Sequence, residues 1–337
     1  MMTKIKALAI AGIALGFATA CQTTGLKSEG DPNRVLLSSF NVKSTNPATL
    51  ANWKDSPLEV EGVMSYPNVG GSGPYPAIIY LLSSGGYNRS YDGGWVNIFN
   101  EAGYATLMVN QFTARGLSLS TGLGSKQSGI TNMSYLSDIY AAVRSLKNNP
   151  RIDGARLATF GMSWGGGIQM YLMSDWYNRN VGDGMQIKAH IALAPNCPFN
   201  VENPKPTSGS MLMLLGELDN WNLPGPCKDY AKRLVAAGAD VKVMVVKGAS
   251  HAWDTQHPVR GKSNVTVYHC QITWNTKTMH AQEKRTGNKA DFGIVDDTAW
   301  ENLWNDCTKK TTVYTGGTTT QRSQTENAVT SFLREKL

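Results

Sequence analysis

Ser163 is the central residue of the sequence GMSWG at 161–165, a GxSxG pattern in which a serine can act as a nucleophile. An apolar run at 156–160 precedes the pattern and a helix-forming stretch follows it, which predicts a tight turn between a strand and a helix. Glycines suit such a turn because side chains there would collide with the neighbouring backbone. The N-terminus of the following helix also stabilises developing negative charge. The pattern therefore favours nucleophilic chemistry at Ser163 over a purely structural turn.

A serine hydroxyl becomes an effective nucleophile only when a base removes its proton, so a histidine must lie nearby. His251 closely follows the last predicted strand, and its loop is expected at the carboxyl edge of the sheet, where Ser163 also emerges. His190 begins a strand and is expected at the opposite edge, while His257 is the nearest alternative to His251. We predict that His251 is the base.

The base needs a carboxylate that fixes its tautomer and stabilises the imidazolium. After a GxSxG turn, this acid is expected between the serine and the histidine in the chain. The apolar run at 211–215 is followed by Glu217 and Asp219, at a strand end between Ser163 and His251. We predict Asp219 as the acid and keep Glu217 as the alternative. The simplest other interpretation is a solvated strand end without a role.

Together these residues resemble the dienelactone hydrolase family of α/β-hydrolases, over about 74–254. The resemblance rests on the segments 102–105, 115–116, 161–166, 216–221, 227 and 248–254. It implies the α/β-hydrolase fold and a Ser-Asp-His triad that works through an acyl-enzyme, with no cofactor and no metal. The namesake enzymes use a cysteine nucleophile, so Ser163 favours cleavage of an ordinary carboxylic ester over the namesake lactone reaction.

An oxyanion hole made of two backbone N–H groups is also expected. Trp164 follows the nucleophile and supplies one donor, and by resemblance Ser84 supplies the other. The family often has His-Gly after its first core strand, where this chain has Leu82-Ser83. Backbone donors tolerate such side-chain changes, but a different loop conformation would lower the rate by about two to three orders of magnitude.

Aromatic and basic residues near the same loops are candidates for a substrate pocket. Tyr87, Phe112 and Trp221 are expected near the carboxyl edge of the sheet, where they would line an acyl or aromatic pocket. The alternative for these rings is ordinary packing in the core or in a lid. Arg115 is a candidate to bind a substrate carboxylate, with a surface ion pair as the alternative.

The elements that must position these residues follow from apolar runs that alternate with amphipathic stretches. Strands are expected at 77–82, 104–109, 156–160, 189–194, 211–215 and 241–246. Helices are expected at 95–102, 132–148, 165–177, 230–237 and 325–335. This alternation predicts an α/β fold with a mostly parallel sheet covered on both faces. We expect one α/β-hydrolase domain at 56–337, with an irregular C-terminal elaboration at about 264–320.

The composition limits the classes of protein and partner. The chain has 337 residues, of which 41% are hydrophobic and 17% charged, which excludes a disordered tail or a coiled coil. The net charge of +7 comes from Lys and Arg residues scattered along the chain, whereas a nucleic-acid surface concentrates its charge in a patch. We therefore expect a small ester or lactone substrate and no nucleic acid.

Residues 1–20 have the features of an export signal, because basic residues precede an apolar run at 7–18 that is too short to span a membrane. Small residues follow, directly before Cys21. This arrangement resembles a bacterial lipobox, in which the cysteine is acylated; ordinary cleavage before Cys21 is the alternative. We expect a protein of the bacterial envelope, in the periplasm or at the outer membrane, lipid-anchored at Cys21, with 21–55 as a tether and lead-in.

Four further cysteines fit an oxidising compartment. They are Cys197, Cys227, Cys270 and Cys307. Three pairings are open, and we prefer Cys197–Cys227 with Cys270–Cys307, because the first two follow strands that are expected to be neighbours. Neither a CxxC pair nor an HExxH sequence occurs, so we expect no metal site.

The sequence thus predicts an exported serine hydrolase. A depolymerase of polyesters or polysaccharide esters, suggested by the expected envelope location, would still be a hydrolase, and two further alternatives stay open. A peptidase of prolyl-oligopeptidase type shares the fold and a similar turn, but such enzymes usually carry a large extra domain that this chain has no room for. A non-catalytic binding protein on the same fold is the second alternative, suggested by the altered Leu82-Ser83 turn.

Overall fold

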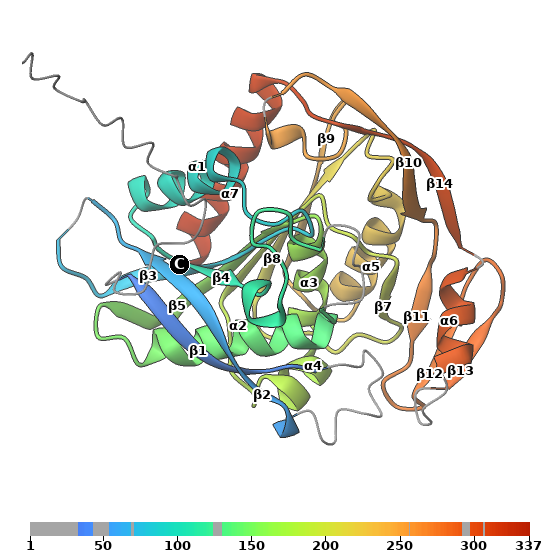
Figure 1. Ribbon diagram of the computed structural model, residues 1–337, viewed down its shortest axis with the longest axis horizontal. Coiled ribbons are helices and arrows are strands. Elements are labelled where there is room, and N and C mark those ends of the chain that lie inside the picture. The colour runs from blue at the N-terminus through green and yellow to red at the C-terminus, as the bar shows by residue number, and fades with distance from the viewer. Residues whose placement is uncertain are drawn as a thin grey trace, which may run out of the picture.

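Figure 1 shows a computed structural model of the chain, which describes residues 33–42, 54–68, 71–123, 130–255, 257–291, 297–305 and 307–337. An eight-stranded sheet with the order β1-β2-β4-β3-β5-β6-β8-β9 crosses the molecule. Its strands are β1 (Arg34–Phe40), β2 (Pro57–Ser65), β3 (Tyr75–Leu81), β4 (Ala105–Asn110), β5 (Ile152–Met162), β6 (Ala189–Leu193), β8 (Ser210–Gly216) and β9 (Val241–Val246). The predicted export signal at 1–20 and Cys21 lie outside the described residues.

The strands from β4 to β9 in the sheet order run parallel, and β1 and β2 complete the sheet as an antiparallel edge. β4 and β6 are buried along their whole length, which is why their sequences are mostly apolar, with Thr106, Asn110 and His190 as buried polar exceptions. β1 instead mixes exposed and buried positions, and it belongs to the segment 21–55 that the sequence suggests is a tether and lead-in. This lead-in therefore contributes a strand to the main sheet.

Helices cover both faces of the sheet. One face packs against α2 (Asn132–Lys147), α3 (Trp164–Leu172), α4 (Asp175–Val181) and α5 (Pro224–Ala236). The other face packs against α1 (Arg89–Glu101) and α7 (Thr319–Lys336), which lie together in Figure 1. Each face thus buries its own hydrophobic cluster, which confirms the predicted α/β class with a mostly parallel sheet.

Four predicted helices have different limits in the structure. α1 begins at Arg89 rather than at 95, and α7 begins at Thr319 rather than at 325. The stretch 165–177 is divided into α3 and α4 at Ser174, whose extended backbone (φ −94°, ψ 120°) interrupts the helical hydrogen bonds. Ser174 instead forms an isolated bridge with Pro206. α5 begins at Pro224 rather than at 230, because proline is well suited to the first turn of a helix.

The C-terminal elaboration expected at 264–320 consists largely of short strands. β10 (Arg260–Tyr268) and β14 (Thr308–Thr315) form an antiparallel ribbon at the margin of the view in Figure 1. A four-stranded sheet contains β7 (Phe199–Val201), β11 (Ile272–Trp274), β12 (His280–Glu283) and β13 (Lys289–Asp291), and α6 (Asp297–Asn305) follows it in the chain. No helix in the described part of the chain is long and apolar enough to cross a membrane.

Candidate active site

Ser163 lies at the turn between β5 and α3, with φ 55° and ψ −112°. A positive φ is costly for a residue with a side chain, and it is typical of the strained turn that exposes a nucleophile above a sheet. The flanking glycines make the turn possible. A Cβ at Gly161 would lie 2.4 Å from the backbone of Gly165, and a Cβ at Gly165 would lie 2.6 Å from the carbonyl oxygen of Leu81.

The side chains of Ser163, His251 and Asp219 form a continuous series of hydrogen bonds. His251 Nε2 lies 3.2 Å from Ser163 Oγ, and His251 Nδ1 lies 2.8 Å from Asp219 Oδ2. His251 and Asp219 are buried, whereas Ser163 is partly exposed. When Nδ1–H donates to the carboxylate, Nε2 is left to accept the serine proton. This is the geometry that a general base requires.

The loop after β8 holds Asp219 in this orientation. Asp219 Oδ1 accepts hydrogen bonds from the backbone N–H groups of Trp221 and Asn222, at 2.9 and 2.8 Å. The second oxygen of the carboxylate faces His251. Glu217, the alternative acid, is exposed and accepts from a backbone N–H of the loop before His251. The structure therefore brings Asp219, and not Glu217, to His251.

The rival histidines have other partners. His190 is buried in β6, where its Nδ1 lies 2.9 Å from Thr159 Oγ1. Burial lowers the pKa of His190 to about 3, so this imidazole stays neutral. His257 is exposed, and its Nδ1 lies 3.4 Å from Thr255 Oγ1. His251 is the histidine that the structure places at Ser163.

The end of β14 holds the backbone of His251 on both sides. The N–H of His251 donates to the carbonyl of Tyr314 at 3.1 Å, and the N–H of Gly316 donates to the carbonyl of His251 at 2.9 Å. Asn220 binds the same strand, because its Nδ2 donates to the carbonyl of Thr312 and its Oδ1 accepts from the N–H of Tyr314, each at 3.0 Å. β14 thus joins the acid loop to the histidine loop. This contact could not be predicted from the sequence because it is made largely by backbone.

The predicted oxyanion donors belong to two anchored segments. Trp164 is the first residue of α3, and no carbonyl within the helix can accept from its backbone N–H. On the other side, the carbonyl of the buried Leu82 accepts from Tyr135 Oη at 2.8 Å and from Gln111 Nε2 at 3.4 Å. Ser84 lies in the turn that follows. The role of Trp164 and Ser84 as oxyanion donors stays a prediction.

The aromatic residues predicted for the pocket have different surroundings. Trp221 lies beside His251, with the two ring centroids 5.0 Å apart. Phe112 is fully buried and packs against Trp164, with ring centroids 6.3 Å apart. Tyr87 is partly buried in the loop after β3. Of the three, Trp221 is the one that contacts the candidate site directly.

The prediction that Arg115 meets a substrate carboxylate is wrong, and so is the surface alternative. Its guanidinium forms a bidentate ion pair with Asp138, at 2.8 and 2.9 Å, with side-chain exposures of 2% and 0%. The other three N–H groups donate to Asn41 Oδ1 and to the carbonyls of Gln111 and Phe40. A guanidinium has five N–H donors, so none remains for a substrate.

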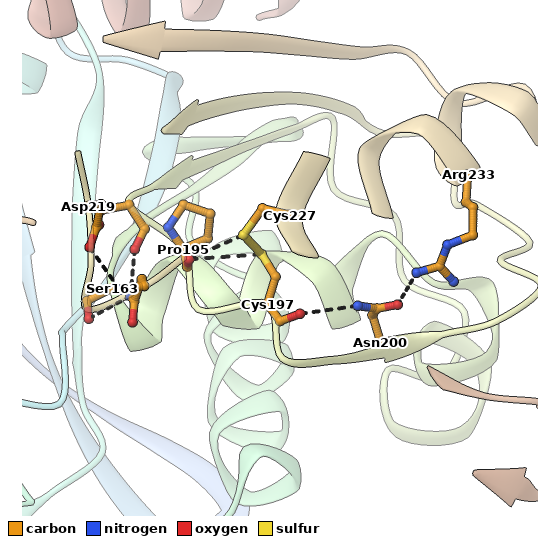
Figure 2. Close-up of a disulfide and its surroundings, with 9 residues drawn as sticks. Ser163, Pro195, Cys197, Asn200, Asp219, Cys227 and Arg233 are labelled. Carbon is orange, nitrogen blue, oxygen red and sulfur yellow. Dashed lines mark hydrogen bonds between the residues drawn. A yellow bond between two sulfur atoms is a disulfide. The ribbon is translucent and has the colours of Figure 1, made fainter. Parts of the chain in front are cut away.

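Two disulfide bonds join Cys197 to Cys227 and Cys270 to Cys307, the pairing preferred from the sequence. Figure 2 shows Ser163 and Asp219 on one side of the first disulfide, with Asn200 and Arg233 on the other. Disulfides persist in oxidising compartments, so the two bonds indicate a protein outside the cytoplasm.

Within the residues that the structure describes, no group of three or more His, Cys, Asp or Glu side chains is arranged to hold a metal ion.

A mostly parallel sheet with a serine on the strained turn after β5, next to a histidine and a carboxylate, defines a hydrolase with the α/β-hydrolase fold. The model of the dienelactone hydrolase family matches residues 63–279, and the chain belongs to this family. Family membership supports an activity of the serine hydrolase type.

Solved structures of other proteins are similar to parts of this chain or to most of it. A dienelactone hydrolase-like promiscuous phosphotriesterase from metagenomic libraries matches with 13% identity and a TM-score of 0.53, over 90% of this chain and 99% of its own. Esterase 2 of Thermogutta terrifontis matches with 14% identity and a TM-score of 0.46, over 66% of this chain and 86% of its own. Dipeptidyl peptidase 4 of Porphyromonas gingivalis matches with 19% identity and a TM-score of 0.46, over 64% of this chain and 32% of its own. A search of the curated proteins gave no match.

Proposed function

We propose that the protein hydrolyses a carboxylic ester or lactone, with Ser163 as nucleophile, His251 as general base and Asp219 as the residue that orients His251. The hydrogen-bond series from Asp219 Oδ2 through His251 to Ser163 Oγ is the observation that carries this proposal. Membership of the dienelactone hydrolase family supports the same chemistry.

In the proposed acylation step, Ser163 Oγ attacks the carbonyl carbon of the ester while His251 Nε2 takes the hydroxyl proton. The carbonyl electrons move to oxygen, and the oxyanion accepts hydrogen bonds from the backbone N–H groups of Trp164 and Ser84. His251 then protonates the leaving alcohol. In deacylation a water molecule repeats the sequence on the acyl-enzyme and releases the acid.

A binding protein without catalysis is less consistent with the backbone of Ser163. A residue with a side chain at such a positive φ costs about 1–3 kcal/mol, and this strain serves a nucleophile but no simple binding surface. A peptidase remains the alternative within the same chemistry. Membership of the dienelactone hydrolase family favours an ester or lactone over a peptide as the substrate.

The proposal is tested with a fluorophosphonate probe and with a panel of p-nitrophenyl esters, lactones and peptide p-nitroanilides. We expect one adduct, mapped to Ser163 by mass spectrometry, and turnover of an ester or lactone. Both should disappear in Ser163→Ala and persist in Ser208→Ala, which changes an exposed serine. Absence of label together with absence of ester and lactone turnover refutes the proposal, and turnover of the anilides alone favours the peptidase.

We also propose that the protein is exported and lipid-anchored at Cys21 in a bacterial envelope. The two disulfides and the signal-like pattern at 1–20 support export, and the position of Cys21 directly after small residues supports acylation.

A further inference from the structure

Asn222 contacts the reacting atom of the candidate nucleophile. Its side-chain nitrogen, Nδ2, lies 3.3 Å from Ser163 Oγ and 2.8 Å from the carbonyl oxygen of Ala194. Asn222 is buried, with 8% of its surface exposed. A carboxamide nitrogen has two N–H donors, so one donates to the carbonyl and the other to the serine oxygen.

These contacts give Ser163 Oγ two partners of different kinds. His251 Nε2 faces the same oxygen at 3.2 Å and accepts its proton. A hydroxyl oxygen keeps two lone pairs for acceptance, and Asn222 donates to one of them. The amide therefore faces the atom on which negative charge grows as the proton leaves for His251. It would act on Ser163 Oγ, whereas the Trp164 and Ser84 N–H groups are predicted to act on the substrate oxyanion.

Three connections keep Asn222 in place. Its backbone N–H donates to Asp219 Oδ1 at 2.8 Å, so the same residue contacts the acid and the nucleophile. The carbonyl of Ala194, its second acceptor, precedes Cys197 by three residues in the chain. The disulfide from Cys197 to Cys227 then joins this segment to α5, which begins directly after the Asn222 loop. The backbone of Asn222 is thus held by Asp219 and its side chain by Ala194, and the disulfide links the segments to which Ala194 and Asn222 belong.

We propose that Asn222 is a further catalytic residue, which stabilises negative charge on Ser163 Oγ; this inference rests on the proposed hydrolase function. In acylation the Oγ–H bond breaks, its proton goes to His251 Nε2, and Oγ forms a bond to the carbonyl carbon. In deacylation that bond breaks, its electron pair returns to Oγ, and His251 returns the proton. The hydrogen bond from Asn222 is strongest while Oγ carries charge, which occurs in both steps.

A purely structural role would consist of the bond to Ala194 alone, and Asn200 provides a matched control. Asn200 is also a buried asparagine whose Nδ2 donates to a backbone carbonyl, that of Cys197, at 3.2 Å, and it lies on the far side of the disulfide (Figure 2). It has no contact with Ser163 in the structure. Asn200→Leu and Asn222→Leu each remove a buried amide that donates to a backbone carbonyl, and Asn200→Leu also removes the acceptor of a hydrogen bond from Arg233.

The experiment compares wild type, Asn222→Leu, Asn222→Asp and Asn200→Leu with the fluorophosphonate probe and with the best ester of the panel. We expect Asn222→Leu to slow probe labelling and to lower kcat by about ten- to a hundredfold with KM within about twofold, the range for a hydrogen bond to a charged group. Asn222→Asp should lose more, because a carboxylate repels the developing charge. Asn200→Leu should lose thermal stability but keep the wild-type rate.

The pH dependence of kcat/KM separates this role from an effect through the acid. Misplacing Asp219 would weaken the imidazolium of His251 and shift the acid limb of the profile to lower pH. Removing a donor to Oγ should lower the whole profile without moving that limb. Asn222 variants with the wild-type rate, a rate loss in Asn200→Leu of equal size, or an acid limb of Asn222→Leu that moves to lower pH each overturn the inference. Wild type that neither labels nor turns over instead refutes the hydrolase proposal itself. If Asn222→Leu does not fold, circular dichroism shows this and the nearly isosteric Asn222→Asp decides.

Discussion

Asp92 in α1 should make the protein less stable as the pH rises. Its carboxylate is 3% exposed and accepts hydrogen bonds from Tyr80 Oη at 2.8 Å and from the backbone N–H of Asn88 at 2.6 Å. Burial raises the pKa of Asp92 from 3.8 to about 7, because desolvation of the charged form outweighs these two bonds. The buried Asp254 on the loop after His251 raises the pKa of Asp92 further.

The sign follows from proton binding in the two states. Between pH 3.8 and about 7 the folded protein keeps a proton on Asp92 that the unfolded chain has lost. The contribution of Asp92 to stability is therefore fully present below about pH 4 and falls as the pH rises through 7. Single-site linkage with these two values gives a loss of about 3 kcal/mol between about pH 5 and pH 9.

Asp92→Asn removes this titration and keeps the shape of the side chain. We expect the free energy of unfolding of the variant, relative to wild type, to rise by about 3 kcal/mol from about pH 5 to pH 9 in urea titrations. Asp55→Asn changes an exposed carboxylate and should follow wild type at each pH. Parallel profiles of wild type and Asp92→Asn would contradict the argument, because they would show that burial does not hold the carboxyl protonated.

Arg115→Ala leaves Asp138 as an uncompensated buried charge, and we expect urea titration at constant pH to show a loss of about 3–5 kcal/mol; a loss typical of a surface pair, below about 1 kcal/mol, would contradict it. Replacing Cys270 and Cys307 by alanine removes a cross-link over a separation of 37 residues, and thermal unfolding should show a cost of about 2–4 kcal/mol. Reduction of wild type also opens Cys197–Cys227 and should cost more than this variant, and an unchanged thermal stability of the variant would contradict the prediction. Cys21→Ser should release the protein from the membrane fraction of a bacterial host, and continued co-sedimentation with membranes would argue against the anchor.

The elements with continuous or strongly periodic apolar patterns could be predicted from the sequence. β4 and β6 are buried along their whole length and mostly apolar, although Asn110 and His190 are polar. In α2, the apolar residues Leu136, Ile139, Tyr140, Val143 and Leu146 recur at helical spacing. β1 was missed because it is an edge strand without a clear apolar pattern: Leu36 and Ser38 are exposed, whereas Ser39 is buried and binds side chains of α2. The break between α3 and α4 was missed because it depends on the bridge from Ser174 to the distant Pro206.

The candidate site could be predicted where the chain order and the strand ends determine positions. Ser163, Asp219 and His251 follow parallel strands and therefore lie at the carboxyl edge of the main sheet. Identifying the end of each strand was enough to predict that the three residues meet. The prediction for Arg115 was wrong because its surroundings depend on Asp138. The sequence pattern of α2 does not indicate that Asp138 is buried and paired with an arginine. Asn222 was missed because it belongs to no motif; its position three residues after the predicted acid was the available signal.

The segment that was hardest to interpret from sequence fixes the histidine. β14 holds His251 by backbone hydrogen bonds alone, and the side chain of Tyr314, whose N–H and carbonyl take part, is 48% exposed. Such a contact constrains the path of the strand rather than its side chains, so it leaves no motif. Cys307 lies directly before β14 and is joined to Cys270 at the end of the paired strand β10, so the second disulfide fixes the other end of the ribbon. Oxidation therefore acts at both sides of the candidate site: one disulfide braces the Asn222 loop beside the nucleophile, and the other braces the ribbon that carries the histidine loop.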